Sequence, residues 1–197
     1  MSLLLWYKNI YPLAEALRYG MFNTISVAST TGYATADYLH WPVFAPVMLL
    51  LLSGVATSAG STGGGIKMVR LLLLLKQAKR ELQRLSHPRA IRPVTLGGKV
   101  VDNHVIFAVL AFIFMYGCTV LVLTMVLLLT DLDLVTAFSA VLASVNCMGP
   151  GLGEVGPHSN FAVLDDFQIA VCTLGMLLGR LEMLSFIALL MPGFWRK

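Results

Sequence analysis

Two glycine-bearing loops hold the residues of this chain whose types and spacing are suited to chemistry. The first loop is residues 29–34, STTGYA, and the second, residues 146–151, NCMGPG, follows about 115 positions later. Each loop comes after a short half-apolar helix and before a long apolar run. Glycine adopts positive φ without steric penalty, so Gly32 can turn successive carbonyls toward one axis. Carbonyls held in this way can replace the water around an ion inside a bilayer, which indicates an ion-selective pore lining.

The candidate ion-binding positions lie in both loops. The carbonyl end of each preceding helix adds partial negative charge beside them, which favours a cation. An ordinary re-entrant turn is the alternative, but a second loop in the same context favours the pore. The predicted filter residues are Thr30, Thr31, Gly32, Tyr33, Asn146, Cys147, Met148 and Gly149. The ion is expected at Thr31, Gly32, Met148 and Gly149.

A third glycine-rich segment, residues 53–65 with the sequence SGVATSAGSTGGG, interrupts an apolar run. A continuous helix disfavours its three consecutive glycines, each of which costs about 1 kcal/mol relative to alanine. Non-helical backbone at membrane depth is tolerated only where protein buries it or where it lines a water-filled cavity. We therefore expect a flexible plug or hinge. A phosphate-binding loop is disfavoured, because Lys67 does not directly follow a glycine and Met68 replaces the magnesium-binding Ser or Thr.

Arg180 lies halfway along the last apolar run, after 13 uncharged residues and two positions before Glu182. An intramembrane charge is costly and normally faces a partner or water. Residues two positions apart do not share a helix face. We expect Arg180 to face the pore or the glycine-rich segment and Glu182 to face protein or cytoplasmic water. An ion pair to a neighbouring helix with only a packing role is the alternative.

The composition indicates a membrane protein. Of the 197 residues, 57% are hydrophobic and 12% are charged, with a mean hydropathy of +0.80. A soluble domain carries about 25% charged residues. The 26 residues 105–130 carry no charge and exceed the roughly 20 that a spanning helix needs.

Charge asymmetry predicts the orientation. Nine of the fourteen basic residues fall between Lys67 and Lys99, which places residues 66–102 and the C-terminus in the cytoplasm by the positive-inside rule. Seven of the ten acidic residues fall on the opposite side, where they favour cation entry. The basic run from Lys76 to Arg92 is a topology signal; binding of anionic lipid headgroups or of a soluble regulatory subunit stays open.

The predicted fold is an all-α polytopic membrane protein with two membrane-pore-membrane repeats. Residues 1–8 are expected to be the last turns of a helix whose beginning is missing. The first repeat, 1–75, comprises this outer-helix end, a pore helix 12–29, a filter 29–37 and a broken inner helix 42–75 with the interruption at 53–65. A basic cytoplasmic connection, 76–102, follows. The second repeat, 103–197, comprises an outer helix 104–130, a pore helix 132–145, a filter 146–153 and an inner helix 165–191.

Four motifs in order resemble the Trk/Ktr/HKT superfamily of potassium uptake proteins, most closely its bacterial TrkH/TrkG branch. They are STTGYATAD at 29–37, AGSTGGGIK at 59–67, NCMGPGLG at 146–153 and GRLE at 179–182. The resemblance covers essentially the whole chain and matches the last two of the four repeats that form a pseudo-fourfold pore in such proteins. It implies K⁺ as the transported ion, no organic cofactor and a place in the cytoplasmic membrane.

The resemblance also implies a gate. In the family, the interrupted inner helix forms an intramembrane loop beneath the filter, and an arginine of the last inner helix faces the ion path. The residues that match are Gly60, Ser61, Thr62, Gly63, Gly64, Gly65 and Arg180. The implied partners are the missing N-terminal half or a full-length relative, a second copy in a homodimer, membrane lipid and a cytosolic nucleotide-binding RCK-type (TrkA-like) subunit. Nucleic acid is not expected.

Other functional classes have less support from the residues. A non-conducting membrane assembly or interaction subunit is the alternative function, because half of a fourfold pore cannot close a filter alone. Enzyme activity is not expected, since the chain has no paired carboxylates, no Ser/His/Asp arrangement and no metal-ligand spacing. Cys118, Cys147 and Cys172 lack the spacing of a disulfide framework or a zinc site and are expected to be small buried residues.

Overall fold

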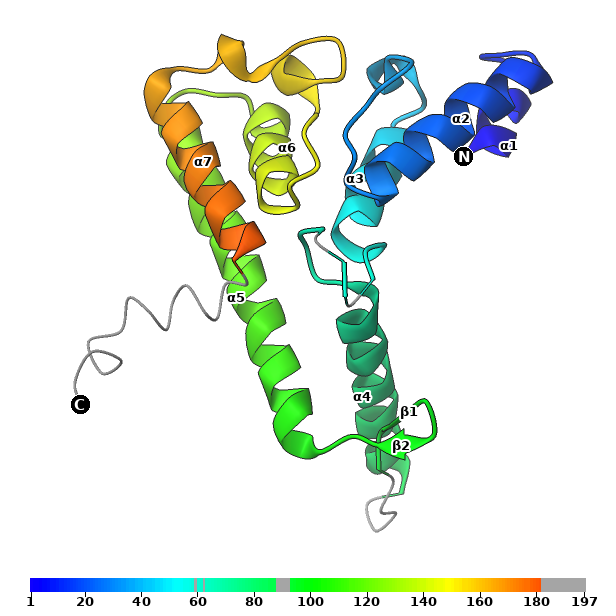
Figure 1. Cartoon of the computed structure of the whole chain (residues 1–197), viewed down its shortest axis with the longest axis vertical. Coiled ribbons are helices and arrows are strands. Elements are labelled where there is room, and N and C mark those ends of the chain that lie inside the picture. Colours follow the sequence, from blue (N-terminus) through cyan, green and yellow to red (C-terminus); the bar gives the residue numbers. More distant parts are fainter. Residues whose placement is uncertain (59, 62, 88–92, 182–197) are drawn as a thin grey trace.

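Seven α-helices dominate the part of the chain that the structure, a computed structural model, describes: residues 1–58, 60–61, 63–87 and 93–181. They form two columns that diverge from a common base, with α6 between their upper parts (Figure 1). The helices are α1 (Ser2–Tyr7), α2 (Leu13–Ala28), α3 (Phe44–Val55), α4 (Met68–Ser86), α5 (Asn103–Leu128), α6 (Leu134–Val145) and α7 (Asp166–Arg180). Short 3-10 turns are η1 (Tyr38–His40), η2 (Gly153–Val155) and η3 (Phe161–Val163).

Helix α5 is, within the described ranges, the one helix both long and apolar enough to cross a membrane. Its 26 residues give a length of about 39 Å, against a hydrocarbon core of roughly 30 Å. Only 22% of its most apolar window is buried, and Phe107, Phe114 and Leu121 are each more than half exposed. A core helix of a soluble protein would be buried, so this exposure fits a helix that faces lipid.

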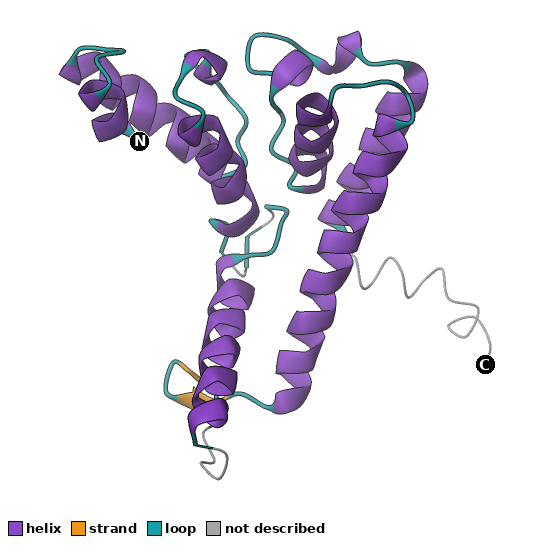
Figure 2. Ribbon diagram, turned by 180° about the vertical axis from the view of Figure 1, so that it is seen from behind, coloured by secondary structure: helices purple, strands orange, loops and turns teal. Residues whose placement is uncertain are grey.

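The other column is built from two shorter helices. Helix α3 has 12 residues, roughly 18 Å, which is too short to cross a bilayer alone. After a non-helical segment, α4 continues downward beside the first half of α5, as Figure 2 shows from behind. The guanidinium carbon of Arg70 lies 3.8 Å from the centroid of the Phe112 ring, and Arg80 Nη1 donates to Asn103 Oδ1 at 3.0 Å.

A small antiparallel hairpin, which the all-α prediction did not include, closes the base of the molecule. Strand β1 (Thr95–Leu96) pairs with β2 (Lys99–Val100), and Gly97 and Gly98 form the turn with φ of +56° and +80°. Two glycines between β-branched and apolar residues are a hairpin signal, since glycine adopts the positive φ that tight turns need. The hairpin joins α4, whose Lys76 Nζ donates to the Thr95 carbonyl.

The positions of the other helices follow from two apolar clusters. One cluster unites α5, α6 and α7 around buried residues that include Leu127, Val141 and Cys172. The other unites α1, α2 and α3 with the end of α6, around Leu5, Val27 and Leu49 among others. Helix α6 belongs to both clusters, so it fixes the two columns relative to each other.

Most predicted helix ranges correspond to observed helices, with two differences. The ranges 12–29, 104–130 and 132–145 agree with α2, α5 and α6 within two residues at each end. The interruption predicted to start at Ser53 begins later, because Ser53 and Gly54 still belong to α3; Ser53 Oγ donates to the Leu50 carbonyl at 2.7 Å within that helix. The predicted inner helix 165–191 is helical over Asp166–Arg180, and its remainder, with Glu182, lies outside the described residues.

Candidate ion pathway

The first and second loops (residues 29–34 and 146–151) leave their helices by the same hydrogen bonds. After α2, the amides of Thr30 and Thr31 donate to the carbonyls of Val27 and Ser26 at 3.1 and 2.8 Å. After α6, the amides of Cys147 and Met148 donate to the carbonyls of Ser144 and Ala143 at 3.0 and 2.9 Å. Counterparts are 117 positions apart, as Gly32 and Gly149 are. This pattern is the Schellman motif, which ends a helix with a sharp turn.

The backbone conformations of the two loops also match. Thr30 and Cys147, at the position where a Schellman motif usually has glycine, have φ of +54° and +53°. Two residues later, Gly32 and Gly149 have φ of +83° and +106°. A side chain in the left-handed region costs roughly 1–2 kcal/mol. This cost occurs at two equivalent positions, Thr30 and Cys147. Each loop therefore has the same strained turn, followed by the same flexible glycine.

Buried polar side chains of each short helix form hydrogen bonds with the backbone at the end of its loop or just after it. Asn23 of α2 accepts from the Thr35 amide at 3.2 Å, and Ser26 donates to the Tyr33 carbonyl at 2.6 Å. Ser139 of α6 accepts from the Leu152 amide at 2.8 Å and lies 3.1 Å from the Leu152 carbonyl. Both loops are therefore fixed at entry and at exit, which leaves little freedom for the residues between.

The two loops meet at Gly32. A Cβ built on Gly32 would lie 2.3 Å from the Met148 carbonyl oxygen, and one built on Gly149 would lie 3.8 Å from Gly32 Cα. The Met148 side chain is 2% exposed and packs into the cluster around Val27 and Leu49, away from this contact. The second loop therefore presents a backbone oxygen toward the first, while its side chain anchors it from behind.

The glycine loop (residues 56–67, all but 59 and 62 described) packs, in its described part, beneath both loops and against the end of α3. The Ile66 amide donates to the Gly54 carbonyl at 2.7 Å, and Thr57 Oγ1 donates to the Gly64 carbonyl at 3.2 Å. A Cβ on Gly63 would lie 3.1 Å from Thr30 Oγ1, and one on Gly64 would lie 2.7 Å from the Asn146 carbonyl oxygen. Only residues without side chains could approach so closely.

The predicted gate residues differ in their surroundings. Gly63 and Gly64 are packed as just described, and a Cβ on Gly65 would lie 2.6 Å from the Gly54 carbonyl oxygen. A Cβ on Gly60, by contrast, would have no atom of the described residues within 4 Å, and Ser61 donates to the Ser58 carbonyl in a local turn. Thr62 lies outside the described residues. Gly63 to Gly65 thus form the packed part of the glycine loop, whereas Gly60 is exposed and Ser61 is half-buried.

A hollow of about 430 Å³, whose lining combines apolar surface with several hydroxyl groups, lies between the first loop and the glycine loop. Hydroxyl groups line it from above and below: Ser29, Thr30, Thr57, Ser58 and Ser61. It lies at the carbonyl end of α2, where the helix dipole adds partial negative charge. Hydroxyl oxygens and a negative helix end suit a hydrated cation.

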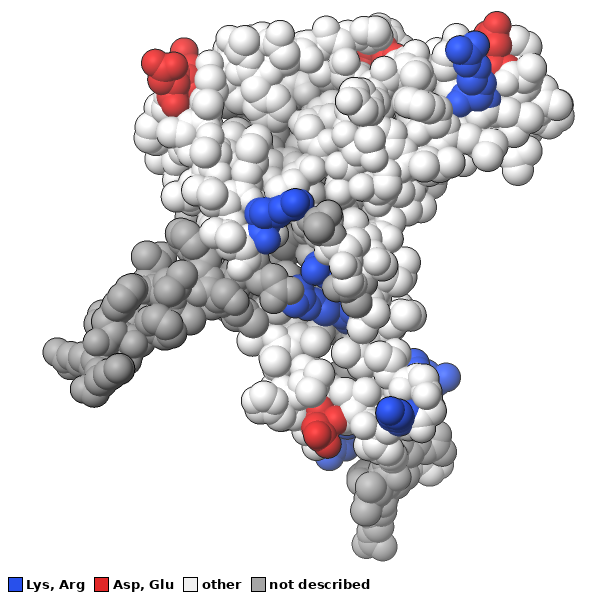
Figure 3. Space-filling model, viewed as in Figure 1, with Lys and Arg blue, Asp and Glu red and all other residues white. Residues whose placement is uncertain are grey.

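Three basic residues converge on the opposite side of the glycine loop. Arg180, Lys67 and Arg70 line a pocket of about 190 Å³ together with Gly63 and Gly65, among others. Figure 3 shows Lys and Arg side chains at this height, midway along the molecule. The structure thus brings Arg180 to the glycine loop, which is one of the two placements that we expected. Lys67 and Arg70, which the sequence analysis did not predict at this place, join it there.

The side chain of Asn146 has a different place from that expected of a filter residue. It is fully buried, accepts from Tyr116 Oη at 2.8 Å and donates to Ser53 Oγ at 2.9 Å. The amide group is therefore occupied within the protein, and only the Asn146 backbone carbonyl remains for an ion. Sequence reasoning missed this contact, although a lone tyrosine in an apolar span signals a polar partner.

The comparisons with known proteins agree with this architecture. The model of a family described as TrkH, cation transport protein, matches residues 7–195. The chain belongs to the TrkH family. It is 43% identical over 183 residues to the Trk system potassium uptake protein TrkH of Vibrio parahaemolyticus, covering 93% of this chain and 37% of that protein. It is 39% identical to TrkH of Salmonella typhimurium and to TrkG of Escherichia coli, covering in each case all of this chain and 40% of the relative.

A solved TrkH-family structure has the same fold. The crystal structure of the potassium transporter TrkH from Vibrio parahaemolyticus superposes with a TM-score of 0.92 at 41% identity, over 99% of this chain and 42% of that one. The resemblance read from the four motifs is therefore confirmed, as is a mostly helical TrkH-like fold. The chain spans about two fifths of the length of the relatives that it matches. A family of cation transport proteins also agrees with the expectation of a transporter and not an enzyme.

Proposed function

We propose that this TrkH-family segment forms two of the walls of a K⁺ uptake pore, each wall a membrane-pore-membrane repeat. The single observation that carries the proposal is the matched pair of helix-ending loops, which have the same hydrogen bonds and φ signs and meet at Gly32 and the Met148 carbonyl. Backbone carbonyls of Thr31, Gly32, Met148 and Gly149 would replace part of the hydration shell of K⁺. Further walls would complete the ring.

Ions would pass from these carbonyls into the hydroxyl-lined hollow below the first loop. The glycine loop and Arg180 would obstruct the path beneath it, because packed backbone and positive charge both oppose a cation there. The glycine loop is the proposed gate. Among the described residues, the bond from the Ile66 amide to the Gly54 carbonyl ties it to α3, and the bond from the Met68 amide to the Thr57 carbonyl ties its start to α4. Breaking few bonds would suffice to move it.

In the proposed placement, α5 crosses the cytoplasmic membrane and the base of the molecule faces the cytoplasm. On the face shown in Figure 3, acidic side chains gather mainly at the upper edge and basic ones at middle and lower levels. Because Arg70 contacts Phe112, ten residues into α5, the start of α4 shares the depth of the spanning helix. We therefore place the cytoplasmic part from about Arg80 onward, where α4 meets the first residue of α5, and not from residue 66.

The proposed partners are the remaining walls of the pore, a second complete copy and a cytosolic RCK-type subunit. The lower end of α4 suits a soluble partner or lipid headgroups, since Leu82 and Leu85 are 67% and 81% exposed near Lys79 and Arg84. Displacement of α4 by such a partner would pull directly on the glycine loop, because α4 begins at Met68, immediately after it.

Complementation tests the pore proposal. Cells that lack their own K⁺ transporters would express this chain alone, or this chain with the N-terminal half of a relative, and K⁺ uptake would be measured. Rescue only with both halves is expected. Trapping of the chain by a full-length partner without K⁺ flux would instead favour an assembly subunit. Rescue by the chain alone would mean that copies of it assemble the pore.

Gly32→Ser tests the ion-binding assignment in a complete pore that contains this segment. The new Cβ would displace the Met148 carbonyl, so the K⁺-over-Na⁺ permeability ratio should fall. Gly98→Ser is the matched control, because Gly98 has nearly the same φ, +80°, but no atom of the described residues lies within 4 Å of its built Cβ. Equal permeability ratios in the two variants would count strongly against the assignment.

A further inference from the structure

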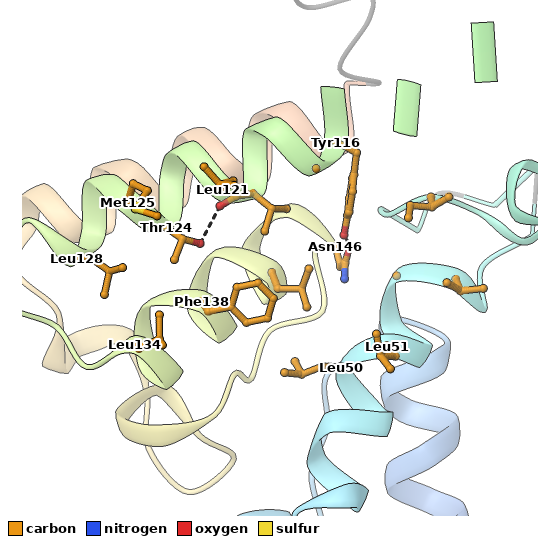
Figure 4. Close-up of a pocket in the computed structure, with 16 residues that line it drawn as sticks. Leu50, Leu51, Tyr116, Leu121, Thr124, Met125, Leu128, Leu134, Phe138 and Asn146 are labelled. Atoms are coloured by element: carbon orange, nitrogen blue, oxygen red, sulfur yellow. Dashed lines mark hydrogen bonds between the residues drawn. The ribbon is translucent and has the colours of Figure 1, made fainter. Parts of the chain in front are cut away.

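A polar bridge of three buried residues connects the second loop to the rest of the molecule. Tyr116 of α5 donates to Asn146 Oδ1 at 2.8 Å, and Asn146 Nδ2 donates to Ser53 Oγ of α3 at 2.9 Å. Asn146 is the residue at which α6 ends and the second loop begins. In Figure 4, the polar end of Tyr116 points toward Asn146 at one edge of the pocket. We call these three residues the Asn146 bridge.

The surroundings of the bridge make its hydrogen bonds hard to replace. Asn146 and Ser53 are fully buried and Tyr116 is 8% exposed. Beside them lies a pocket of about 540 Å³ between α3, α5 and α6, whose lining is almost entirely apolar, as Leu50, Leu121 and Phe138 illustrate (Figure 4). Hydrogen bonds are stronger in such surroundings, and an unsatisfied partner costs more than it does in water.

The same bridge touches the glycine loop. A Cβ on Gly65 would lie 3.1 Å from Asn146 Oδ1 and 2.6 Å from the Gly54 carbonyl oxygen. Gly54 follows Ser53 directly, and its carbonyl accepts from the Ile66 amide at 2.7 Å. A movement of the glycine loop away from α3 therefore disturbs the surroundings of the Asn146 amide group and the backbone next to Ser53.

The first loop has no equivalent connection among the described contacts. Its counterpart of Asn146, 117 positions earlier, is the exposed Ser29. Ser29 Oγ lies 2.7 Å from the Ile25 carbonyl of its own helix and 2.8 Å from Thr31 Oγ1 in its own loop. The first loop is thus capped locally, whereas the second is held by helices that are distant in sequence.

We propose that Tyr116 and Ser53 are positioning residues, which fix the second loop through Asn146 and make its ion selectivity depend on the position of the glycine loop. This inference rests on the proposed function and adds a direct coupling between gate and filter. Neither residue needs to contact the ion. Loss of either arm should let the Met148 and Asn146 carbonyls shift, which lowers the preference for K⁺.

The test uses a complete TrkH-family pore that contains this segment, reconstituted in liposomes. Tyr116→Phe and Ser53→Ala each remove one hydroxyl of the bridge, and K⁺/Na⁺ permeability ratios come from reversal potentials. Each variant should lower the ratio roughly twofold to tenfold, the range expected for one lost hydrogen bond. The double variant should lower it by less than the product of the two, because both act through one amide. Thr124→Val is the matched control: Thr124 is also buried on α5, but among the described residues its hydroxyl bonds to the Val120 carbonyl of its own helix and not to Asn146.

The outcomes separate the two proposals. The positioning role of the bridge would be refuted if both single variants kept normal K⁺-selective flux with unchanged K⁺/Na⁺ permeability ratios. It would also be refuted if the ratio fell by the same factor in Thr124→Val. Either result would leave the pore proposal standing. Absence of K⁺ flux in the unaltered pore would refute the proposed function instead. If Tyr116→Phe is not recovered from membranes, Ser53→Ala decides alone by the same ratio, since it also removes a single hydroxyl of the bridge.

Discussion

Gly179→Ala should destabilise the fold and disturb ion flux, because α7 touches the end of α6 there without any intervening side chain. A Cβ on Gly179 would lie 1.8 Å from the Val145 carbonyl oxygen, whereas real Cβ contacts essentially never fall below 3.0 Å. The two helices must separate by about 1.2 Å, the difference between these values. Neither atom belongs to a flexible side chain, so the backbone itself must move. Overpacking of this kind costs about 1–3 kcal/mol.

Gly117→Ala supplies the matched control for this prediction. Gly117 is also helical, in α5, but nothing lies within 4 Å of its built Cβ. Both variants gain the same helix propensity of about 1 kcal/mol, so that gain cancels in the comparison. The remaining difference in the free energy of unfolding should be about 1–3 kcal/mol, with Gly117→Ala the more stable.

Stability would be measured by denaturation of each purified variant of the complete pore in detergent, and flux by K⁺ uptake into liposomes. Gly179→Ala should also alter basal flux, because the adjacent Arg180 faces the glycine loop and moves with α7. Equal stabilities of the two variants would refute the contact between α7 and α6 as described. Equal stabilities together with altered flux would support the role of Arg180 beside the glycine loop but would refute the packing argument.

Three further outcomes are expected in the complete pore. Shortening residues 60–65 should raise basal K⁺ flux, since the loop loses the glycines that fill the space under both ion-binding loops; unchanged flux would exclude this segment as a gate. Arg180→Gln should raise K⁺ conductance by removing positive charge beside the path, whereas Arg84→Gln, on the exposed end of α4, should not; equal effects would show a general surface-charge effect. Cys147→Gly should relieve the left-handed strain at φ +53° and raise the unfolding free energy by up to about 1 kcal/mol, a gain that denaturation of the purified protein would detect.

The sequence predicts the helices and the position of the loops well because those features depend on local patterns. A long uncharged run gives α5, and short amphipathic runs before glycine-bearing loops give α2 and α6. Asp133 accepts from the Val135 amide at the start of α6, as an aspartate before a helix commonly does. Capping, apolar length and glycine content all act within a few residues, so no knowledge of the tertiary structure is needed to read them.

The contacts that define the site could not be predicted in the same way. Tyr116, Asn146 and Ser53 come from three helices, and no spacing in the sequence connects them. The convergence of Lys67 and Arg70 with Arg180 is likewise a result of how α4 and α7 flank the glycine loop. The end of α3 was misjudged for a related reason: Gly54 weakens a helix locally, but the Asn146 carboxamide, 3.4 Å from its built Cβ, leaves little room for a larger residue.

Several glycines from different elements lie against the carbonyl oxygens at the end of α6 and in the second loop. The Val145 oxygen faces Gly64 and Gly179, the Asn146 oxygen faces Gly64, and the Met148 oxygen faces Gly32. Three separate elements thus place a residue without a side chain against the carbonyl end of α6 and the loop that follows it. A larger residue at any of these places would collide with a carbonyl oxygen and turn it aside. Glycine is therefore required here less for its freedom of φ than for the space that it leaves, and this requirement links the gate, the last helix and the first loop to one set of backbone oxygens.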